Sequence, residues 1–305
     1  MNLEKFERYR EIFGDGYGEF LEYSARPLKK CVRVNTLKIG VEECVERLEK
    51  RGLSLERLPW IENGFRVEEK NCLIGHTLEH FLGLVYVQEG ASMVPPLVLG
   101  PEEGEVVLDL AAAPGSKTTQ ISEMMKNTGI VVANDISFKR IKSLRSNAER
   151  LGVVNLVVTR MDGRRFGKKY PGVFDRVLLD APCSSEGSVR KDWGVLNRLS
   201  LRLIRKMSSL QKSLLTSALE AVKPGGTVVY STCTVAPEEN EEVVDHAVKS
   251  GLAAVEPVKV PGLVTRPGLT EWNGRRFDDS LERCIRIWPQ DNDTQAFFVA
   301  KLVRL

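Results

Sequence analysis

One stretch in the second half of the chain indicates its architecture: Phe174-Asp-Arg-Val-Leu-Leu-Asp180-Ala-Pro-Cys183-Ser-Ser-Glu-Gly187. The apolar run that begins it predicts a buried strand. An acid, Asp180, and a thiol, Cys183, follow in a turn stiffened by proline. Ligands of open α/β sheets bind at the carboxyl ends of the strands. We therefore expect Asp180 and Cys183 at a binding crevice.

A second strand-like segment, Thr227-Val-Val-Tyr-Ser231, leads to another thiol, Cys233. If this strand lies next to that of residues 174–179, then Cys183, Cys233 and Asp180 share one crevice. A single free cysteine is more often a small buried apolar residue. Two cysteines at matched strand ends favour covalent chemistry on an electron-poor ring.

Strands and helices alternate from residue 106 onward. Short apolar, often β-branched runs predict strands at Val106–Leu110, Ile130–Ala133, Leu156–Val158, Phe174–Leu179 and Thr227–Tyr230. Helix periodicity covers Lys117–Lys126, Phe138–Leu151 and Leu199–Val222. This alternation predicts an α/β fold with a doubly wound parallel sheet. Two last runs, Cys284–Trp288 and Ala296–Leu302, predict an antiparallel hairpin at the edge of the sheet, with no helix between them.

The N-terminal third of the chain predicts a separate small α+β domain. Residues 1 to about 25 have helix periodicity, and Val41–Arg51 predicts a second helix that ends at Gly52. Strand-like pieces lie at Cys31–Thr36, Phe65–Val67 and Leu84–Gln88. The segment Gly100-Pro-Glu-Glu-Gly104 is the expected boundary. It gives an N-terminal domain of residues 1–100 and a larger domain of residues 101–305.

A loop of small residues, Asp109-Leu-Ala-Ala-Ala-Pro-Gly-Ser-Lys-Thr118, joins the first strand of the large sheet to its helix. Such a loop is where a nucleotide-like cofactor lies against the backbone, yet this one lacks the glycines that phosphate-binding loops need. Asp135 follows the second strand at the spacing of an acid that binds ribose hydroxyls. Asp162 follows the third strand, where it can hydrogen-bond an adenine edge. A ribose and an adenine without phosphates indicate S-adenosylmethionine.

We expect this cofactor to contact the loop, the two acids and the neighbouring strand end. The expected residues are Ala111, Ala112, Ala113, Pro114, Gly115, Ser116, Lys117, Asp135, Arg140, Asp162 and Asp180.

Composition indicates an ordinary globular protein. Its 305 residues are 42% hydrophobic and 28% charged, without an apolar run of bilayer length or a signal-peptide core. We therefore expect a cytoplasmic protein. Its six cysteines have no metal-knuckle spacing and are expected to be free thiols. No metal site is expected, because His76 and His80 have helical ligand spacing but no third ligand.

The charge of the chain is unevenly distributed. The net charge is +3, yet residues 139–212 hold 18 Lys and Arg against 6 Asp and Glu. A basic segment within a near-neutral chain favours a nucleic-acid partner. The alternative is a solvated helical face whose acidic partners lie elsewhere in the sequence.

Together these motifs resemble the RsmB/Nop2/Sun family of RNA cytosine-C5 methyltransferases over about residues 30 to 303. The matching segments are Arg33-Val-Asn-Thr36, Tyr86-Val-Gln-Glu-Gly-Ala-Ser92, Asp109–Thr118, Asp135, Asp162, Asp180-Ala-Pro-Cys-Ser184, and Ser231-Thr-Cys-Thr234 with Pro237-Glu-Glu-Asn-Glu241. The resemblance implies a Rossmann-like methyltransferase sheet with an RNA-recognition-like N-terminal domain. Ser116, Ser185, Gln290 and Gln295 depart from the usual pattern, which obscures substrate choice.

The resemblance also implies roles for the catalytic residues. Cys233 is the expected nucleophile toward C6 of cytosine, Cys183 serves release of the product, and Asp180 stabilises charge on the ring. From the residues alone the two cysteines cannot be told apart. Lys117 either assists Asp180 or has a capping or salt-bridge role. The implied partner is RNA, with tRNA favoured over rRNA, and the protein is expected to be a monomer.

Two other functions remain open on the sequence. An amino-directed methyltransferase uses an Asp/Asn-Pro-Pro-aromatic motif at this strand end, but Ala181 and Cys183 replace its first proline and its aromatic residue. The second is an RNA-binding assembly factor without turnover, against which the intact Cys183, Cys233 and Asp180 argue.

Overall fold

The computed structural model of the protein describes residues 3–69 and 72–305. The described part of the predicted N-terminal helical segment is helical, but in short pieces: η1 Leu3–Tyr9, α1 Arg10–Phe13, η2 Gly14–Gly16 and α2 Tyr17–Ala25. The backbone of Gly14 has a φ of 51°, a left-handed value at which α1 ends. The prediction for residues 1 and 2 falls outside the described residues.

The small domain is built on a four-stranded antiparallel sheet of order β2-β3-β1-β4. Its strands are β1 Lys30–Val34, β2 Leu53–Arg57, β3 Gly64–Glu69 and β4 Val85–Val87, joined by α3 Val41–Lys50, η3 Ile74–His76 and α4 Leu78–Phe81. Cys44 and Leu48 of α3 pack against Val32, Val34 and Phe65 of the sheet. The strands expected at β1, β3 and β4 are present, whereas β2 was not predicted.

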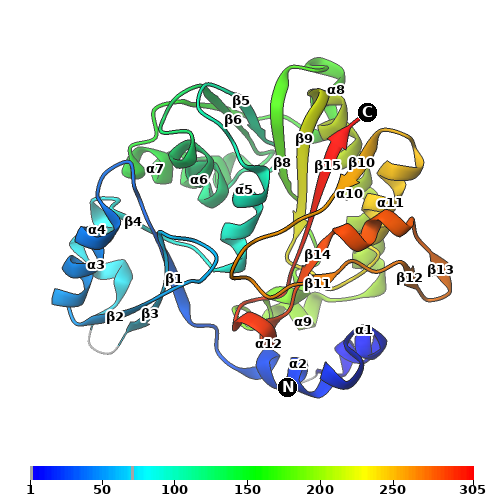
Figure 1. The fold of residues 1–305 in the computed structure, drawn as a ribbon, viewed down its shortest axis with the longest axis horizontal. Coiled ribbons are helices and arrows are strands. Elements are labelled where there is room, and N and C mark those ends of the chain that lie inside the picture. The colour runs from blue at the N-terminus through cyan, green and yellow to red at the C-terminus, as the bar shows by residue number, and fades with distance from the viewer. Residues whose placement is uncertain (1–2, 70–71) are drawn as a thin grey trace.

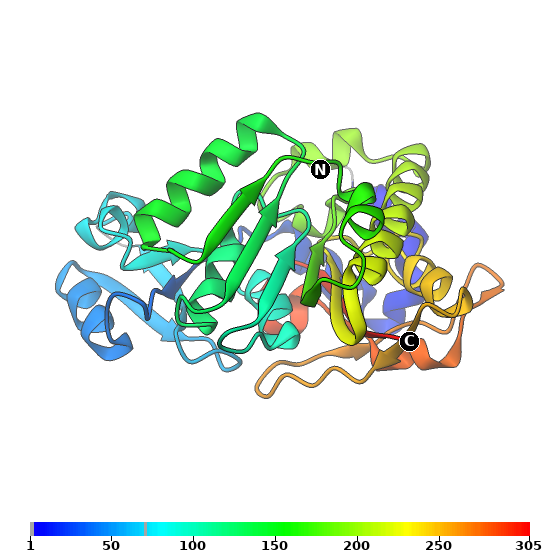
Figure 2. The same ribbon diagram turned by 90° about the horizontal axis from the view of Figure 1, so that it is seen from above.

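The large sheet has nine strands among the described residues, most of them in the order β11-β14-β15-β9-β8-β5-β6-β7, with β10 paired to β15. Five strands are parallel: β5 Val106–Asp109, β6 Ile130–Asn134, β7 Leu156–Thr159, β8 Phe174–Asp180 and β9 Val222–Thr232. This confirms the doubly wound α/β sheet. Figures 1 and 2 show the small domain to one side of it.

Helices cover the large sheet, and the strands bury side chains on both of its faces. The principal helices are α5 Val94–Leu99, α6 Ser116–Met124, α7 Phe138–Leu151, α10 Leu201–Ala221 and α11 Glu241–Lys249. Leu178 of β8 packs in the core with α5 and α6, while its neighbours Val177 and Leu179 pack in the core with α10 and α11. Such two-sided burial explains why these strands are near-continuous apolar runs in the sequence.

The C-terminal edge of the sheet corrects one expectation. β14 Ile285–Ile287 and β15 Phe297–Arg304 are antiparallel as predicted. However, a short helix, α12 Pro289–Asn292, lies between them, with its proline at a first-turn position where a missing N–H costs nothing. The remaining elements are α8 Phe166–Lys169, α9 Gly194–Arg198, β10 Ala253–Glu256, β11 Arg266–Pro267, β12 Glu271–Trp272, β13 Arg275–Arg276, and the turns η4 Ala91–Met93, η5 Gly163–Arg165, η6 Glu186–Ser188 and η7 Asp279–Arg283.

Two segments before residue 100 pack with the large sheet. Phe6, Tyr9 and Phe20 of the N-terminal helices belong to the same core as α10 and β9, and α2 lies beside α12 (Figure 1). Helix α5 packs on β8 and β9. The domain division at residue 100 stays a prediction, and this packing leads us to propose a boundary before α5 instead.

A buried polar interface joins the small domain to α6. The Arg33 guanidinium, from β1, forms an ion pair with Glu123 and donates to Thr119 Oγ1 at 3.1 Å. The Glu123 carboxylate also accepts from the Thr36 hydroxyl, 2.8 Å away. Arg33 is only 1% exposed. Removing one member of such a pair leaves an uncompensated buried charge, so the small domain and α6 depend on each other.

Candidate active site

The loops after β8 and β9 bring the two expected cysteines together. The strands are parallel neighbours, with Asp180 opposite Ser231 in the ladder, which confirms that they are adjacent. Beyond the strand ends, the Gly187 backbone N–H donates to the Cys233 carbonyl at 3.1 Å. The Cys183 and Cys233 sulfur atoms lie 3.3 Å apart, so both thiols meet in one crevice.

These two thiols have opposite acidities. A hydrogen bond from Cys183 lowers the pKa of Cys233 from 9.0 to about 7, although burial acts in the other direction. The same hydrogen bond, together with burial, raises the pKa of Cys183 well above its usual value. Since the thiolate is the nucleophilic form of cysteine, the lowered pKa of Cys233 makes it the better candidate for a nucleophile.

Asp180 ends β8 with a partner on each carboxylate oxygen. Its Oδ2 accepts from Lys117 Nζ at 2.7 Å, and its Oδ1 accepts from the Ser231 hydroxyl at 2.8 Å. Lys117 lies in the first turn of α6 and also donates to Ser92 Oγ at 2.9 Å. Of the alternatives left open for Lys117, the geometry gives a salt bridge to Asp180 inside the crevice. Ser92, which holds Lys117, was not expected at the site.

A cavity of about 540 Å³ lies beside the cysteines, within the size range of small-molecule sites. Six expected cofactor residues line it: Ala111, Ala113, Asp135, Arg140, Asp162 and Asp180. Both cysteines also line it. A smaller hollow of about 30 Å³ is lined by Ala112, Pro114, Ser116 and Lys117, among others. Gly115 lines neither of the two.

Small residues in the cofactor loop let its backbone lie close to α7. Ala112 and Ala113 pack against Leu144 of that helix. Gly115 has a φ of 105°, and a Cβ there would lie 2.7 Å from Leu144 Cδ1. A larger residue at this turn would therefore need a strained backbone and a movement of the Leu144 side chain. This explains why Gly115 shapes the loop without lining the cavity.

The two expected acids stand at the strand ends as predicted. Asp135 Oδ1 accepts from the Ser137 N–H at 2.8 Å, and Arg140 forms an ion pair with its Oδ2 at 3.1 Å. Asp162 begins the turn η5, and its hydrogen bond with the Arg164 side chain lowers its pKa. Carboxylate oxygens accept hydrogen bonds, which suits the hydroxyl and amine donors of a nucleoside.

Two polar residues of the cavity region were missed by sequence reasoning. Asn134 lines the cavity and ties three strand ends together, because its Nδ2 donates to the carbonyls of Leu110 and Met161 at 3.1 and 2.9 Å. Asp109 is buried, which raises its pKa to about 7. Its Oδ2 accepts from the Thr118 hydroxyl at 2.6 Å, while its Oδ1 has no hydrogen-bond partner among the described residues. In the sequence, Asn134 and Asp109 are each the polar residue that ends an apolar run, and this pattern could have identified both.

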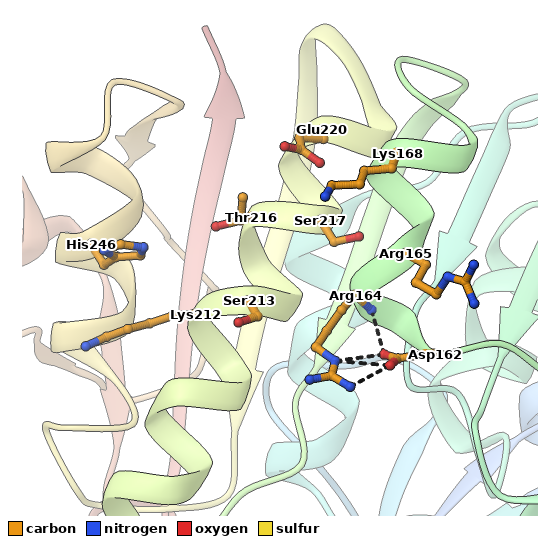
Figure 3. Close-up of a pocket in the computed structure, with 10 residues that line it drawn as sticks. All are labelled: Asp162, Arg164, Arg165, Lys168, Lys212, Ser213, Thr216, Ser217, Glu220 and His246. Carbon is orange, nitrogen blue, oxygen red and sulfur yellow. Dashed lines mark hydrogen bonds and ion pairs between the residues drawn. The ribbon is translucent and has the colours of Figure 1, made fainter.

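A second, basic hollow of about 500 Å³ adjoins the cavity and shares Asp162 and Arg164 with it. Figure 3 shows Lys168 beside Glu220, and Arg164 paired with Asp162, on one side of this hollow. Lys212 and His246 lie on the other side. Lys212 forms an ion pair with Glu242 at 2.6 Å. The predicted basic segment is therefore partly neutralised by acids from other parts of the chain.

Further findings concern the described residues only. All six cysteines are free, as expected. No group of three or more His, Cys, Asp or Glu could hold a metal ion within residues 3–69 and 72–305. Over the same ranges, every helix is too short or too polar to traverse a lipid bilayer.

The parallel sheet and its cavity at the strand ends define a class, the S-adenosylmethionine-dependent methyltransferases with a Rossmann-like fold. The chain belongs to the family described as 16S rRNA methyltransferase RsmB/F, whose model matches residues 96–303. Residues 3–90 match the N-terminal domain of 16S rRNA methyltransferase RsmF. The expected family resemblance, fold and cofactor are confirmed, and the chain is an RNA methyltransferase.

Individual relatives agree with this assignment. The chain is 45% identical, over 99% of its length and 96% of the relative's, to tRNA (cytosine(49)-C(5))-methyltransferase of Pyrococcus abyssi. It is 44% identical to ribosomal RNA small subunit methyltransferase F of Vibrio parahaemolyticus, over 93% of its length but only 59% of the relative's. A crystal structure of a methyltransferase homolog protein from Pyrococcus horikoshii matches with a TM-score of 0.88, 37% identity, and coverage of 98% and 94%.

Another solved structure, of NSun6 from Pyrococcus horikoshii with SFG, superposes with a TM-score of 0.85 at 25% identity. It covers 98% of this chain and 97% of that one. The similarity therefore extends over both sheets.

Proposed function

We propose that the protein methylates C5 of cytosine in RNA through a covalent intermediate, with Cys233 as nucleophile and Cys183 as the residue that releases the product. One observation carries this proposal: two sulfur atoms 3.3 Å apart whose pKa values are shifted in opposite directions. The lowered pKa favours the thiolate of Cys233, and the raised pKa favours the protonated thiol of Cys183. Sequential roles for the two sulfur atoms need this difference.

The proposed reaction begins with the Cys233 thiolate. It adds to C6 of the target cytosine, which makes C5 nucleophilic. S-adenosylmethionine supplies the electrophilic methyl group that C5 takes. Asp180, which Lys117 and Ser231 hold in place, hydrogen-bonds the exocyclic amine or a protonated N3. It thereby stabilises the charge that develops on the ring.

Release needs a base for the C5 proton, and we assign that role to Cys183. While Cys233 is a thiolate, it keeps Cys183 protonated. Once the Cys233 sulfur is bonded to C6 it carries no charge, so Cys183 can lose its proton to solvent. The Cys183 thiolate then takes the C5 proton. The electron pair of the C5–H bond re-forms the C5–C6 double bond, and the Cys233–C6 bond breaks to return the thiolate.

The cavity residues suit the cofactor. Asp135 is proposed to accept hydrogen bonds from the ribose hydroxyls, and Asp162 to contact the adenine edge. Ala111 and Ala113 leave the loop backbone open to the methionine part, beside the cysteines. The 540 Å³ volume and the common wall with both thiols support this arrangement.

We further propose tRNA rather than rRNA as the substrate. The relative named as a tRNA methyltransferase is matched over 96% of its length, whereas the first ribosomal RNA relative is matched over 59% of its length. The RNA is proposed to cross residues 139–212. Phe138, which directly precedes this segment, is 58% exposed, and Lys142 and Arg160 flank its ring at 5.1 and 5.8 Å. An exposed aromatic ring between cations suits a stacked base. The expectations of a monomer and of a cytoplasmic protein stay predictions.

The test is a covalent trap with transcribed tRNA, S-adenosylmethionine and denaturing electrophoresis. Cys233→Ser should neither methylate nor form an adduct, because an alcohol is too weakly acidic to form the nucleophile near neutral pH. Cys183→Ser should still attack and transfer, but it should accumulate a cofactor-dependent protein–RNA adduct. The double variant should lose that adduct.

Other outcomes would exclude the proposal. Adducts from Cys233→Ser and none from Cys183→Ser would show that Cys183 is the nucleophile and Cys233 serves release. Full activity in both variants would overturn the thiol mechanism. Methylation of the exocyclic amine without adducts would indicate an amino-directed enzyme, and RNA binding without methylation would indicate an assembly factor. Comparing tRNA with rRNA fragments under the same conditions tests the substrate preference.

A further inference from the structure

Cys183 lies in a turn that β-sheet hydrogen bonds do not hold. The parallel ladder of β8 and β9 ends at the pair Asp180 and Ser231. One further backbone hydrogen bond, from the Ala181 N–H to the Ser231 carbonyl at 2.8 Å, follows it. The position of the Cys183 sulfur therefore depends on what fixes the backbone of Pro182 and Ser184 on either side of it.

Two buried side chains hold this turn at both ends. Gln211, from α10, donates from Nε2 to the Pro182 carbonyl at 2.8 Å and to Glu239 Oε2 at 2.8 Å. Glu239 Oε2 in turn accepts from the Ser184 backbone N–H at 3.0 Å. Gln211 and Glu239 thus bracket Cys183, and we call these two residues the clamp.

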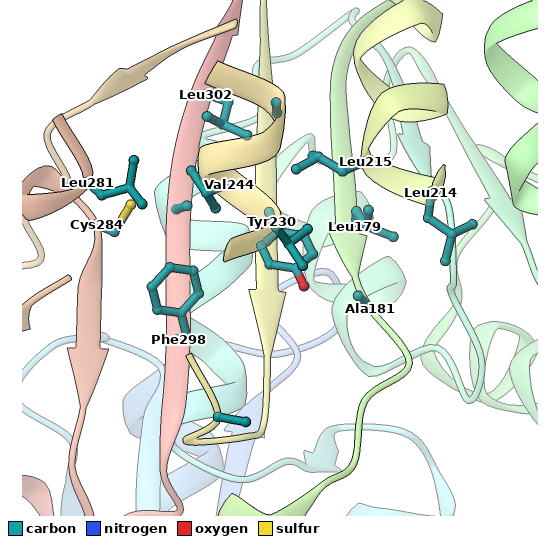
Figure 4. Packing of buried hydrophobic residues seen from close by; sticks show 14 of the residues in the cluster. Leu179, Ala181, Leu214, Leu215, Tyr230, Val244, Leu281, Cys284, Phe298 and Leu302 are labelled. Carbon is teal, nitrogen blue, oxygen red and sulfur yellow. The ribbon is translucent and has the colours of Figure 1, made fainter. Parts of the chain in front are cut away.

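The two halves of the clamp come from elements with firm positions of their own. Figure 4 shows Leu214 and Leu215 of α10 packed toward Leu179 of β8 and Ala181, the residue after β8. Glu239 lies in the segment between Cys233 and α11, and its backbone carbonyl accepts from the buried Tyr230 hydroxyl of β9. The clamp therefore fixes the Cys183 turn relative to the strand that carries Cys233.

Within the described part of the chain, the clamp buries polar atoms without hydrogen-bond partners, a loss of stability that apolar residues packed in the same place would avoid. Gln211 and Glu239 are both 0% exposed, yet Gln211 Oε1 and Glu239 Oε1 have no hydrogen-bond partner among the described residues. Burial raises the pKa of Glu239 to about 7. Unsatisfied polar atoms in a buried site need a specific explanation, and proximity to Cys183 provides one here.

We propose that Gln211 and Glu239 are positioning residues for the release step: they hold Cys183 where its sulfur can take the C5 proton. This inference rests on the role proposed for Cys183. The hydrogen bonds of the clamp run to the Cys183 turn and not to Cys233 or Asp180 among the described residues, so its loss should affect release more than addition to C6 or methyl transfer. Its loss should resemble loss of Cys183 in one step of the reaction only.

The experiment separates methyl transfer from release in single-turnover reactions with tRNA. It compares Gln211→Leu, the gentler Gln211→Asn, Glu239→Ala and the near-isosteric Glu239→Gln. Reactions are run at about pH 9, which increases the ionised fraction of Cys233 if a displaced Cys183 no longer lowers its pKa. Leu219→Ala, a core truncation on α10 away from the turn, is the control for general destabilisation. Thermal unfolding confirms that each variant is folded.

We expect Gln211→Leu and Glu239→Ala to slow product release by about tenfold or more, since small displacements of a reacting group have effects of this size. Their adducts should accumulate, while methyl transfer changes by less than about threefold. Gln211→Asn should show the same defect, because the shorter side chain cannot reach both partners. Glu239→Gln should release product like the unmodified protein, since an amide oxygen can still accept from the Ser184 N–H. Leu219→Ala should accumulate no adduct.

The failures are distinguishable. If Cys183→Ser accumulates adduct but all the folded clamp variants release product normally, the clamp has no part in release, and the proposed function stands. If Cys183→Ser forms no adduct, the proposed role of Cys183 and the clamp inference both fail. If a Gln211 or Glu239 variant slows methyl transfer as much as release, the clamp supports the whole site rather than Cys183.

Discussion

At the scale of single residues, the proposed reaction depends on a difference between two identical side chains. Cys183 and Cys233 share one hydrogen bond, which stabilises the thiolate of Cys233 and the thiol of Cys183. Interacting groups titrate as a pair, so each cysteine sets the acidity of the other. The order of events in the proposed reaction follows from this coupling, since charge on Cys233 must disappear before Cys183 can become a base.

Alkylation of Cys233 as a function of pH tests this coupling. A lowered pKa means that the reactive thiolate is present above about pH 7 and is lost as the pH falls below it. In Cys183→Ala the midpoint should rise toward the ordinary value, because the hydrogen bond is gone. Mass spectrometry of iodoacetamide adducts measures it, in a Cys72→Ser background that removes the partly exposed Cys72 thiol. An unchanged midpoint would mean that Cys183 does not tune Cys233.

Asp135 offers a second test at this scale. If it binds ribose hydroxyls, Asp135→Ala should weaken cofactor binding by about 1–3 kcal/mol, the cost of a lost charge-assisted hydrogen bond. Titration calorimetry measures this change. RNA affinity, measured by filter binding, should barely move and serves as the control. Unchanged cofactor affinity would remove Asp135 from the site.

At the scale of elements, the sequence predicted best what carries a strong periodic signal. The bounds of α7 are those expected, and β8 and β9 follow from apolar runs buried on both faces. β2 was missed because Leu53-Ser-Leu-Glu-Arg57 buries only its first residue fully, Leu55 is partly buried, and the other three residues are polar and exposed. α12 was missed because four residues are too few to show helix periodicity.

The residues of the candidate site also fall into two groups, those that the sequence could place and those that it could not. Asp180, Cys183 and Cys233 stand next to strands in the sequence, so neighbouring strands alone bring them together. Ser92, Gln211 and Glu239 reach the site through tertiary packing of distant segments. No local pattern could place them there, although Ser92 and Glu239 fall within segments that carry the family resemblance.

The basic segment also supports a prediction about an element. Lys168 and Lys169 of α8 are exposed. If residues 139–212 hold RNA, Lys168→Glu with Lys169→Glu should flatten the dependence of RNA affinity on salt, by about one unit of slope for each phosphate that the variant no longer neutralises. Lys259→Glu with Arg276→Glu, two exposed sites outside the segment, is the matched control. An equal slope in both pairs would place the RNA elsewhere.

At the scale of the whole molecule, buried acids link stability to pH. Burial raises the pKa of Asp109, Glu186 and Glu239 to about 7. The folded state therefore binds protons more tightly than the unfolded state. The stability that these groups contribute is fully present below about pH 4.5 and is lost as the pH rises through about 7.

Glu186→Gln should remove one of these contributions. The free energy of unfolding, measured with urea, should fall less between about pH 5 and pH 8 in the variant than in the unmodified protein. The difference should be about 2–3 kcal/mol, the size of the Glu186 shift. Glu256→Gln, at a partly exposed strand position, is the control. Parallel stability curves for Glu186→Gln and the unmodified protein would contradict the prediction.

The Arg33–Glu123 pair has a consequence for how such proteins can be recombined. The helix that begins at the cofactor loop carries an acid in its last turn, Glu123, whose ion pair in the described part of the chain is with Arg33 of the small domain. An unrelated RNA-binding module fused in place of residues 30–87 would leave Glu123 buried without its cation. The two halves are therefore not interchangeable parts. A chimera would inherit a working catalytic half only if its new module brought an arginine to the same place.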